Sequence, residues 1–579
     1  MIGVSTGYKQ LCETSNRPKS YVIAKYGSFD RTVKAKVKDV TGDKQPFSDF
    51  NKLFNEIKAT NFNYLSCEPN RLKLGNTLYF IKDKTTPNTN ENIAYWSLEM
   101  SNQNRVFSTN PTITITFTEK VKFTELVLYF QEVCKKFTVY YYNDSTLVMT
   151  RNIGNNTSLV VQTSGSTASQ NVTFNKIKIE FIETQEPYRY IKLNEIDFGD
   201  YLTYSNDKIL DFNIIDEISL DGSELSSNSL VLDIDNTDGE YDILNPNSKL
   251  SLLQEKQEIS MFHYMYTGAK YEEVALGTFL LKNASVNEQR VKIEAYDQIY
   301  FMNDIYYGSR FYKNESVYNI LLDLFYFFNF TNFDITSETN DIYLTGYIPN
   351  VSFREALRLI VEASCLLVKQ TRYGKIHIFR QNTAKVKTFE RNYIFKENPS
   401  KILSDFILDV KEYNYSNRTE NYQIYSSELQ ASKDNYVITF NQAPILPDTL
   451  LKMEENDDYE IISSYASNCV IKVNKDTTIK LKATLINQNV SSFNIPSKTT
   501  KEYSLKEIDN KLITKNNSSE VYTWKTTKRN IGYDFKFPLV PYVETGDGCY
   551  YKTKFNTTNA FTITKLEFSK SILQEIEGK

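Results

Sequence analysis

The residue types that most often carry acid–base, thiol and metal chemistry are scarce in this 579-residue chain. Two histidines, His263 and His377, rule out a histidine-rich metal site and leave little for acid–base catalysis. Each lies in a stretch typical of a strand, which favours a structural role. Cys365 and His377 could face each other across a hairpin, as a thiol nucleophile and its base would. Cys365 opens the apolar run Cys-Leu-Leu-Val, however, which favours a buried, unreactive thiol.

An acidic segment, LDIDNTDGEYDILNP, has the start of a calcium-loop pattern. With Asp233 as the first ligand, the third and fifth positions also carry oxygen side chains. The sixth position needs glycine and is Asp238, and the twelfth needs a bidentate glutamate and is Leu244. We therefore interpret the segment as a turn in which Asp238 and Gly239 join two strands.

No other catalytic pattern stands out. The chain has no phosphate-binding glycine-rich loop, no G-x-S-x-G and no H-E-x-x-H, and none of its paired carboxylates is distinctive among 71 acidic residues. The prediction is a protein that is not an enzyme, with no catalytic residues, no metal ligands and no cofactor.

Charge and hydropathy exclude further classes of function. The net charge of −4 and the absence of a Lys/Arg cluster argue against nucleic-acid binding. No stretch approaches the roughly 18 to 20 apolar residues of a membrane span. The N-terminus lacks the pattern of a secretory signal. Six cysteines lie far apart without a C-x-x-C pair, which indicates reduced thiols in a chain made in the cytoplasm.

The elements that would position any site are mostly strands. Aromatic residues make up 14% of the chain, with 42 Tyr and 36 Phe, and both types favour strands and large interfaces. Apolar and polar residues alternate from Trp96 to Gly199, which predicts five or more half-buried strands in a β-sandwich or jelly roll. Shorter alternations predict a strand over 34–40, and a helix is expected over 49–58.

A change of pattern marks a small α/β part at 311–395. Helical spacing over 352–364 places Leu357 and Ile360 on one buried face, and Ser352 with Glu355 forms a capping box at the helix start. A hairpin follows, turning at Tyr373 and Gly374. The fold class is therefore mainly β with a small α/β part, in several domains. The predicted domains are an N-terminal segment (1–81), a jelly roll (82–200), a first β-domain (201–310), the α/β domain (311–395) and a second β-domain with the C-terminal segment (396–579).

Four segments in the same order resemble a known family, the hub and tail-associated proteins of phage tails and related contractile particles. In the first, a strand runs into an Asn-x-Asp-Gly turn and a following Asn-Pro. The second has a Gly-x-Phe-x-Leu strand and an Ala-Tyr-Asp strand end, the third a helix and an Arg-x-Gly-Lys hairpin, and the fourth a Glu-x-Gly-Asp turn before a last strand pair. In this order, the four segments are residues 229–250, 275–304, 347–379 and 541–576.

The alternating region before them is similar to discoidin-like, galactose-binding jelly rolls. It opens on YWSLEMSN and closes on EPYRYIKLNEIDFG, as a Trp-Ser pair and an Arg-x-x-x-Leu/Ile-x-Glu-Ile ending do in such domains. The resemblance suggests Trp96, Tyr188 and Arg189 as a carbohydrate-binding platform, by stacking and hydrogen bonding. The same three residues could equally be core and inter-strand contacts.

The resemblance to hub proteins implies β-barrel-like domains and a homotrimer that joins the sixfold tail tube to a threefold tip. The implied partners are the tail tube or distal tail protein, the tape-measure protein and a tip or spike protein, with host cell-wall carbohydrate as a further candidate. The implied location is the virion tail tip or baseplate, and a phage-tail-like bacteriocin fits equally. The alternatives are a carbohydrate- or receptor-binding tip protein that acts through the jelly roll, and a glycoside hydrolase, which two Trp in the chain disfavour.

Overall fold

The structure is a computed structural model that forms two compact units, each described here by itself. One, the large unit, comprises Met1–Ala24, Tyr204–Asp242 and Glu258–Lys579, and the other, the sandwich unit, comprises Lys25–Thr203 and Ile243–Gln257. The structure describes residues 2–13, 19–29, 31–54, 66, 68–69, 93–121, 126–163, 173–245, 248–250, 253–268, 270–328, 330, 332–381, 384–390, 396–399, 406–454, 457–495, 506–527, 533–553, 555, 557–570 and 573–578. The mainly β, multidomain fold predicted from the sequence is confirmed.

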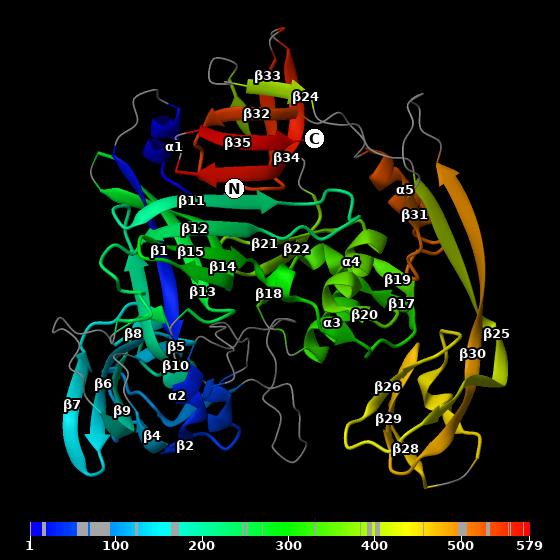
Figure 1. Cartoon of the computed structure of the whole chain (residues 1–579), viewed down its shortest axis with the longest axis horizontal. Helices are drawn as coiled ribbons and strands as arrows, with labels where there is room; N and C mark the ends of the chain where they lie inside the picture. Colours follow the sequence, from blue (N-terminus) through cyan, green and yellow to red (C-terminus); the bar gives the residue numbers. More distant parts are fainter. Residues whose placement is uncertain are drawn as a thin grey trace. The chain divides into compact units, whose positions relative to one another are not determined.

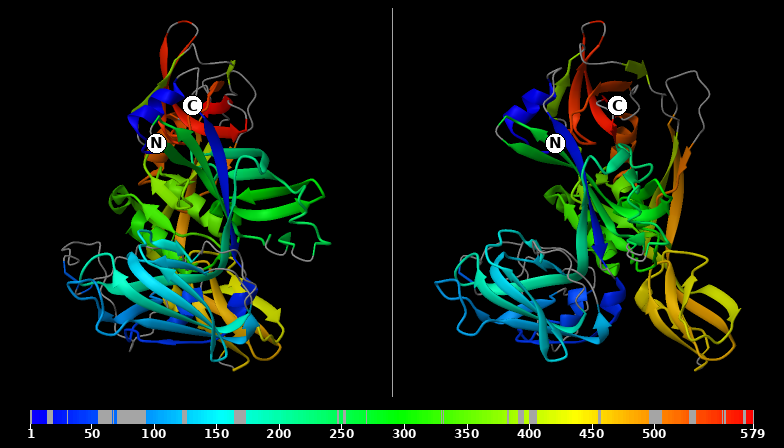
Figure 2. Two further views of the ribbon diagram at one scale, coloured as in Figure 1. Left: turned by 90° about the vertical axis from the view of Figure 1, so that its left-hand side faces the viewer. Right: turned by 60° about the vertical axis from the view of Figure 1, so that its left-hand side comes forward.

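The sandwich unit consists of two antiparallel sheets that face each other across an apolar core (Figure 2). The core is formed by inward residues such as Ile113, Leu128 and Phe181, all fully buried. The strands predicted from alternation between Trp96 and Gly199 are present. The first sheet runs β2 (Val37–Gly42), β4 (Thr112–Val121), β9 (Phe174–Thr184), β6 (Cys134–Asn143) and β7 (Thr146–Ile153), and the second contains β3 (Tyr95–Met100), β10 (Tyr190–Tyr204), β5 (Leu126–Phe130) and β8 (Val160–Gln162).

The N-terminal part of the chain differs from its prediction. The expected strand over 34–40 is split between helix α2 (Arg31–Ala35) and strand β2, because Val33 packs into the sandwich core from the helix while β2 pairs with β4. The expected helix over 49–58 is a 3₁₀ turn, η1 (Phe50–Phe54), and the remainder of it lies outside the described residues.

This pairing also bears on the predicted domain boundary at 82. The sandwich unit begins at Lys25, since β2 and η1 pack with the sandwich. The predicted linker over 82–91 lies outside the described residues. The predicted domain boundaries, the one at 82 included, stay predictions.

The large unit is built on one twisted, open sheet (Figure 1). Strands of the predicted first and second β-domains share it, since β11 pairs with β34. The sheet does not close into a barrel in the part of the chain that the structure describes. Its order is β24 (Lys396–Pro399), β32 (Tyr533–Pro538), β35 (Leu573–Gly578), β34 (Thr558–Ser569), β11 (Ile209–Glu217), β12 (Ser229–Asp235), β15 (Arg290–Tyr296), β14 (Tyr271–Val286) and β13 (Glu258–Tyr266).

Further elements complete this sheet and connect it to the rest of the chain. Helix α1 (Thr6–Cys12) precedes β1 (Ser20–Phe29), and the chain passes between the two units within β1. Strand β33 (Gly548–Lys552) pairs with β34 on one side and, in parallel, with β23 (Lys385–Phe389) on the other. A 3₁₀ turn, η3 (Gln298–Phe301), follows β15.

The small α/β part centres on two helices, α3 (Val317–Phe327) and α4 (Phe353–Ala363). The predicted start of α4 is confirmed, because the Ser352 side chain accepts a hydrogen bond from the backbone N–H of Glu355. Leu357 and Ile360 are fully buried, as predicted. The accompanying elements are β16 (Ile305–Tyr306), β17 (Tyr312–Ser316), β18 (Phe333–Ile335), η4 (Ser337–Asp341), β19 (Tyr343–Gly346), β20 (Val351–Ser352), β21 (Leu367–Gln370) and β22 (Ile376–Phe379).

Two very long strands, β25 (Phe406–Leu429) and β30 (Thr477–Ile495), form a ribbon with a small three-stranded sheet at one end (Figure 1). Ile424 and Ile479 of the ribbon share a core with Ile471 of the small sheet. The remaining elements are β26 (Tyr436–Thr439), η6 (Pro447–Thr449), β27 (Leu451–Lys452), β28 (Tyr459–Ser464), β29 (Asn468–Val473), β31 (Lys506–Ile508) and α5 (Ser518–Thr527).

A buried charge fastens α4 to α5. Glu362 of α4 is 1% exposed, and its carboxylate lies 2.8 Å from Lys525 Nζ and 2.9 Å from Arg358 Nη1. Asn510 donates a third contact to it at 3.1 Å. A carboxylate with two cations and an amide donor is satisfied without water, so it can remain inside the domain.

Leu357→Ala should lower the free energy of unfolding of the large unit by about 2–5 kcal/mol, because it leaves a cavity in a filled core. Urea unfolding followed by fluorescence in a Trp96→Phe background would measure this, since Trp524, the other of the two tryptophans, packs against the same core. Leu451→Ala is the control, as that side chain is 55% exposed. Equal midpoints for both variants would contradict the prediction.

Candidate functional site

Trp96, one of the three residues of the carbohydrate platform suggested by the sequence, is buried in the sandwich unit. It is 4% exposed, with Lys192 Nζ 4.5 Å from its ring centroid. Phe47 packs edge-on at 5.4 Å and Tyr190 stacks at 6.3 Å. The indole ring is therefore covered by side chains of its own unit, as in the alternative of core and inter-strand contacts.

Arg189 is also occupied by internal contacts. Its Nη1 donates to the backbone carbonyls of Pro69 and Tyr188, both at 3.0 Å, and its Nε lies 3.3 Å from Glu132. Tyr188 is 39% exposed and takes a left-handed backbone conformation, with φ of 55°. Trp96 lies in β3, whereas Tyr188 and Arg189 lie in the segment just before β10.

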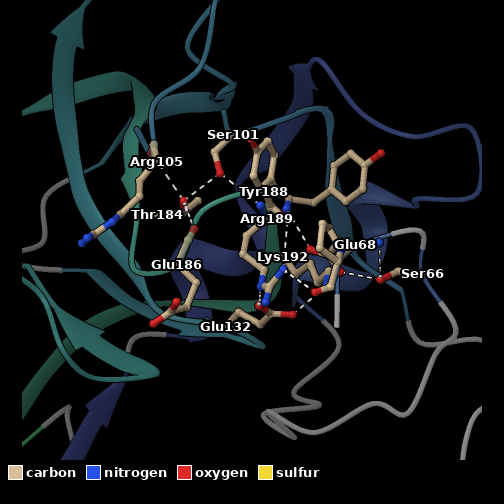
Figure 3. Close-up of polar contacts among 12 residues, drawn as sticks. Ser66, Glu68, Ser101, Arg105, Glu132, Thr184, Glu186, Tyr188, Arg189 and Lys192 are labelled. Carbon is tan, nitrogen blue, oxygen red and sulfur yellow. Dashed lines mark hydrogen bonds and ion pairs between the residues drawn. The ribbon is translucent and has the colours of Figure 1, made fainter. Parts of the chain in front are cut away.

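The sequence reasoning missed the residue that organises this region, Lys192. Its side chain is 4% exposed and its Nζ forms ion pairs with Glu68 and, at 2.8 Å, with Glu132 (Figure 3). Glu68 also accepts from the backbone N–H of Tyr190 at 2.9 Å. The cluster is a closed ion-pair network whose charges are satisfied by one another, so it holds β10 and the segment at Glu68 together.

The histidines and thiols have structural surroundings. His263 Nδ1 lies 2.8 Å from the Tyr8 hydroxyl, and His377 Nδ1 lies 2.9 Å from Asp334. Cys365 is not opposite His377 in the hairpin, because the register pairs His377 with Lys369. Burial raises the pKa of the Cys365 thiol to about 12, which keeps it protonated and unreactive. Among the described residues no group of His, Cys, Asp and Glu could hold a metal ion.

The acidic segment forms no calcium loop. Gly239 supplies the left-handed conformation of a turn, with φ of 68°, and Asp238 pairs with Lys208. The turn follows β12 but does not form a tight hairpin, since the next strand, β13, starts only at Glu258. In the described part of the chain no helix is long and apolar enough to cross a bilayer.

A buried arginine in the large unit joins segments that lie far apart in the sequence. Arg372, in the turn between β21 and β22, is 4% exposed. Its guanidinium donates to the carbonyls of Ala275 at 3.2 Å, Val543 at 2.5 Å and Pro541. The central carbon of the guanidinium, Cζ, lies 5.0 Å from the centroid of the Phe568 ring. Five donors in a fixed fork suit arginine, rather than lysine, to hold several carbonyls at once.

Acidic groups around Arg372 balance its charge. Asp216 lies 3.8 Å from Arg372 Nε, which is an electrostatic attraction beyond hydrogen-bonding distance, and accepts from the Thr545 hydroxyl at 2.8 Å. Burial raises the pKa of Asp216, while the Arg372 and Lys369 cations oppose that rise. Lys369 donates to the Thr545 carbonyl at 2.8 Å and lies 3.7 Å from Glu544. We call this set of contacts the Arg372 junction.

The hairpin also bonds to the strand that carries Gly277. The Gln370 amide donates to the carbonyl of Thr278 at 2.7 Å, and the Thr278 hydroxyl donates back to the carbonyl of Arg372 at 2.9 Å. The Phe279 ring lies over Gly277, where a Cβ would approach ring carbons to 2.5 Å. This crowding accounts for the Gly-x-Phe spacing, since residues two apart in a strand share a face.

Asp297 is a second buried acidic residue of the large unit, and it connects two strands of the large sheet. It is 1% exposed and accepts from the backbone N–H groups of Asn228 at 2.8 Å and Tyr300 at 3.3 Å. Burial raises its pKa to about 7, against these two hydrogen bonds, which lower it. The carboxyl therefore links the start of β12 to the end of β15 and caps η3.

Arg372→Met should destabilise the large unit by about 3–5 kcal/mol, because it leaves the buried Asp216 without its counter-charge. Combining it with Asp216→Asn should cost less than the sum of the two single changes. Trp524 fluorescence during urea unfolding measures both. The control is Arg290→Met, since that side chain is 52% exposed and forms a surface ion pair worth about 1 kcal/mol or less. Additive effects at Arg372 and Asp216 would contradict the junction.

Asp297→Asn should change how the free energy of unfolding depends on pH. The folded-state pKa of about 7 exceeds the ordinary 3.8, so the folded protein binds this proton more tightly than the unfolded chain does. The wild type should therefore lose stability, relative to the variant, as pH rises from about 4 to about 7. A lost hydrogen bond in the variant adds an offset that pH does not change. Parallel stability curves over this range would count against the prediction.

Comparisons with known proteins gave structural likenesses only. No protein-family model matches the chain, and no curated protein matches it. It is similar to the 43 kDa tail protein of prophage MuSo2 from Shewanella oneidensis, at 9% identity over 65% of this chain and 94% of that one, with a TM-score of 0.38. It is similar to a tail protein from Neisseria meningitidis MC58, at 10% identity over 65% and 93%, with a TM-score of 0.36. Over 28% of its length it is similar to GH31 CBM32-2, solved bound to GalNAc, at 15% identity over 98% of that chain, with a TM-score of 0.18.

Proposed function

We propose that this chain is a structural, non-enzymatic subunit at the tip of a phage tail or phage-tail-like particle. In this proposal it is a hub: a homotrimer on the tail axis that joins the sixfold tube to a threefold tip. Its partners are then the tail tube or distal tail protein, the tape-measure protein and a tip or spike protein. Its location is the tail tip or baseplate of the virion.

The observation that carries the proposal is the Arg372 junction. The four sequence segments that resemble hub proteins meet there or pair with strands that do. Arg372 of the Arg-x-Gly-Lys hairpin binds Ala275 of the second segment and Val543 of the fourth. Strand β12 of the first segment pairs with β11, which carries Asp216 of the junction. The segments therefore resemble the family in residues that hold this fold together, rather than in residues scattered over its surface.

The internal contacts of these segments also support a non-enzymatic role. The charged side chains of these segments, such as Lys369, Arg372 and Asp297, bind backbone groups of their own unit. Polar groups that are buried and bound to backbone are not placed to bind and transform a substrate.

Exposed apolar side chains support a role in assembly. In the large unit Tyr343 is 52% exposed, Val490 51% and Phe555 75%. Tyr266 and Tyr271 form an exposed pair on neighbouring strands, with ring centroids 5.3 Å apart. Aromatic residues are enriched in the cores of permanent protein interfaces, where such side chains are covered by a partner.

The test is the oligomeric state and the symmetry of the particle. Light scattering of the purified chain should give three times the chain mass of 67.3 kDa, and electron microscopy of the particle should show threefold symmetry at this position. A monodisperse monomer at micromolar concentration, together with sixfold or no symmetry in the particle, would overturn the hub proposal.

A further inference from the structure

The large unit contains a cavity away from the Arg372 junction. Its volume is about 640 Å³, and it lies where the segment before β20 meets the loop after β26 and the middle of β30. That volume is within the range of about 300–1,000 Å³ found for small-molecule sites.

The lining of this cavity is uncharged. None of its 13 residues is Asp, Glu, Lys or Arg, although such residues make up 24% of the chain and about three would be expected in a set of this size. An anionic or cationic ligand would enter without a counter-charge, which is costly in a recess partly shielded from water.

The lining instead combines an apolar floor with amides. Phe440, Leu485 and Ile486 are buried, at 6%, 8% and 1% exposure, and Tyr347 is buried beside them. Five lining residues are Asn or Gln. Two of these, Asn441 and Gln442, stand exposed in the bend after β26, and the structure gives their side-chain amides no hydrogen-bond partner.

We propose that this cavity binds a short neutral oligosaccharide. A sugar ring has an apolar face that packs on aromatic and aliphatic side chains, and adjacent hydroxyls that both donate and accept. An amide offers two donors and one acceptor oxygen at fixed geometry, so it pairs with such hydroxyls without adding charge. Pro349 and Ala443 line the cavity and are half-buried, so they offer the first kind of contact, with Phe440 and Leu485 beneath them, and the amides of Asn441 and Gln442 provide the second. The proposal does not depend on the hub role, since it rests on this cavity alone.

The test is a titration of the full chain with three trisaccharides, by calorimetry and by saturation-transfer NMR. The probes are N,N′,N″-triacetylchitotriose and maltotriose, which are neutral, and the deacetylated glucosamine trimer, which is cationic and otherwise matches the first. Saturable binding is expected for at least one neutral probe and not for the cationic one.

The variant Asn441→Ala with Gln442→Ala should weaken that binding about tenfold or more, because two hydrogen-bonding side chains are lost. Both residues are exposed, so the thermal unfolding midpoint should stay unchanged. Gln423→Ala with Asn474→Ala is the matched control, as it removes one Gln and one Asn that are exposed outside the cavity.

Three results would overturn the proposal. The first is no saturable binding of either neutral probe up to about 10 mM. The second is equal binding of the cationic trimer. The third is neutral-sugar binding that survives Asn441→Ala with Gln442→Ala, which would assign the sugar to another surface of the chain.

Discussion

A buried guanidinium that must find partners for its donors is the constraint on which the large unit depends. Arg372 cannot lose its proton inside the protein, so its charge and its N–H groups have to be satisfied by whatever surrounds it. The surrounding groups are backbone carbonyls of Ala275, Pro541 and Val543, drawn from parts of the chain more than 250 residues apart. Because carbonyls are fixed by the path of the backbone, one side chain sets the positions of two segments relative to its own hairpin.

The sandwich unit also contains a buried cation, a lysine, whose charge is balanced by neighbouring side chains. Lys192 is buried in β10 and is balanced by Glu68 and Glu132, while its stem and ammonium cover the ring of Trp96. The α/β part repeats the pattern with Glu362 held between Arg358 and Lys525. Each of these buried charges is paired, and an alternative packing would leave that charge without its partner.

The buried ion pairs of the interior differ from the uncharged surfaces that this chain leaves exposed. The ionic side chains at these three places are directed at neighbouring parts of the same unit, whereas the cavity near Phe440 is lined by uncharged residues alone. The exposed tyrosines of β13 and β14, Tyr266 and Tyr271, form a third kind of surface, which is aromatic.

The sequence by itself determined the local elements whose pattern repeats within a few residues. Alternation fixed the strands of the sandwich, and helical spacing with Ser352 fixed α4 and its buried residues Leu357 and Ile360. Only the tertiary structure decided that Trp96 is covered by Lys192, that the alternating stretch at 34–40 divides into a helix and a strand, and that Arg372 is an internal clamp. The physical reason is the distance along the sequence over which each signal acts. Periodicity within an element shows which of its faces is apolar, but it does not show which other element packs against that face. The Thr545 hydroxyl reaches Asp216 across 329 residues, and no local pattern in either segment specifies that contact.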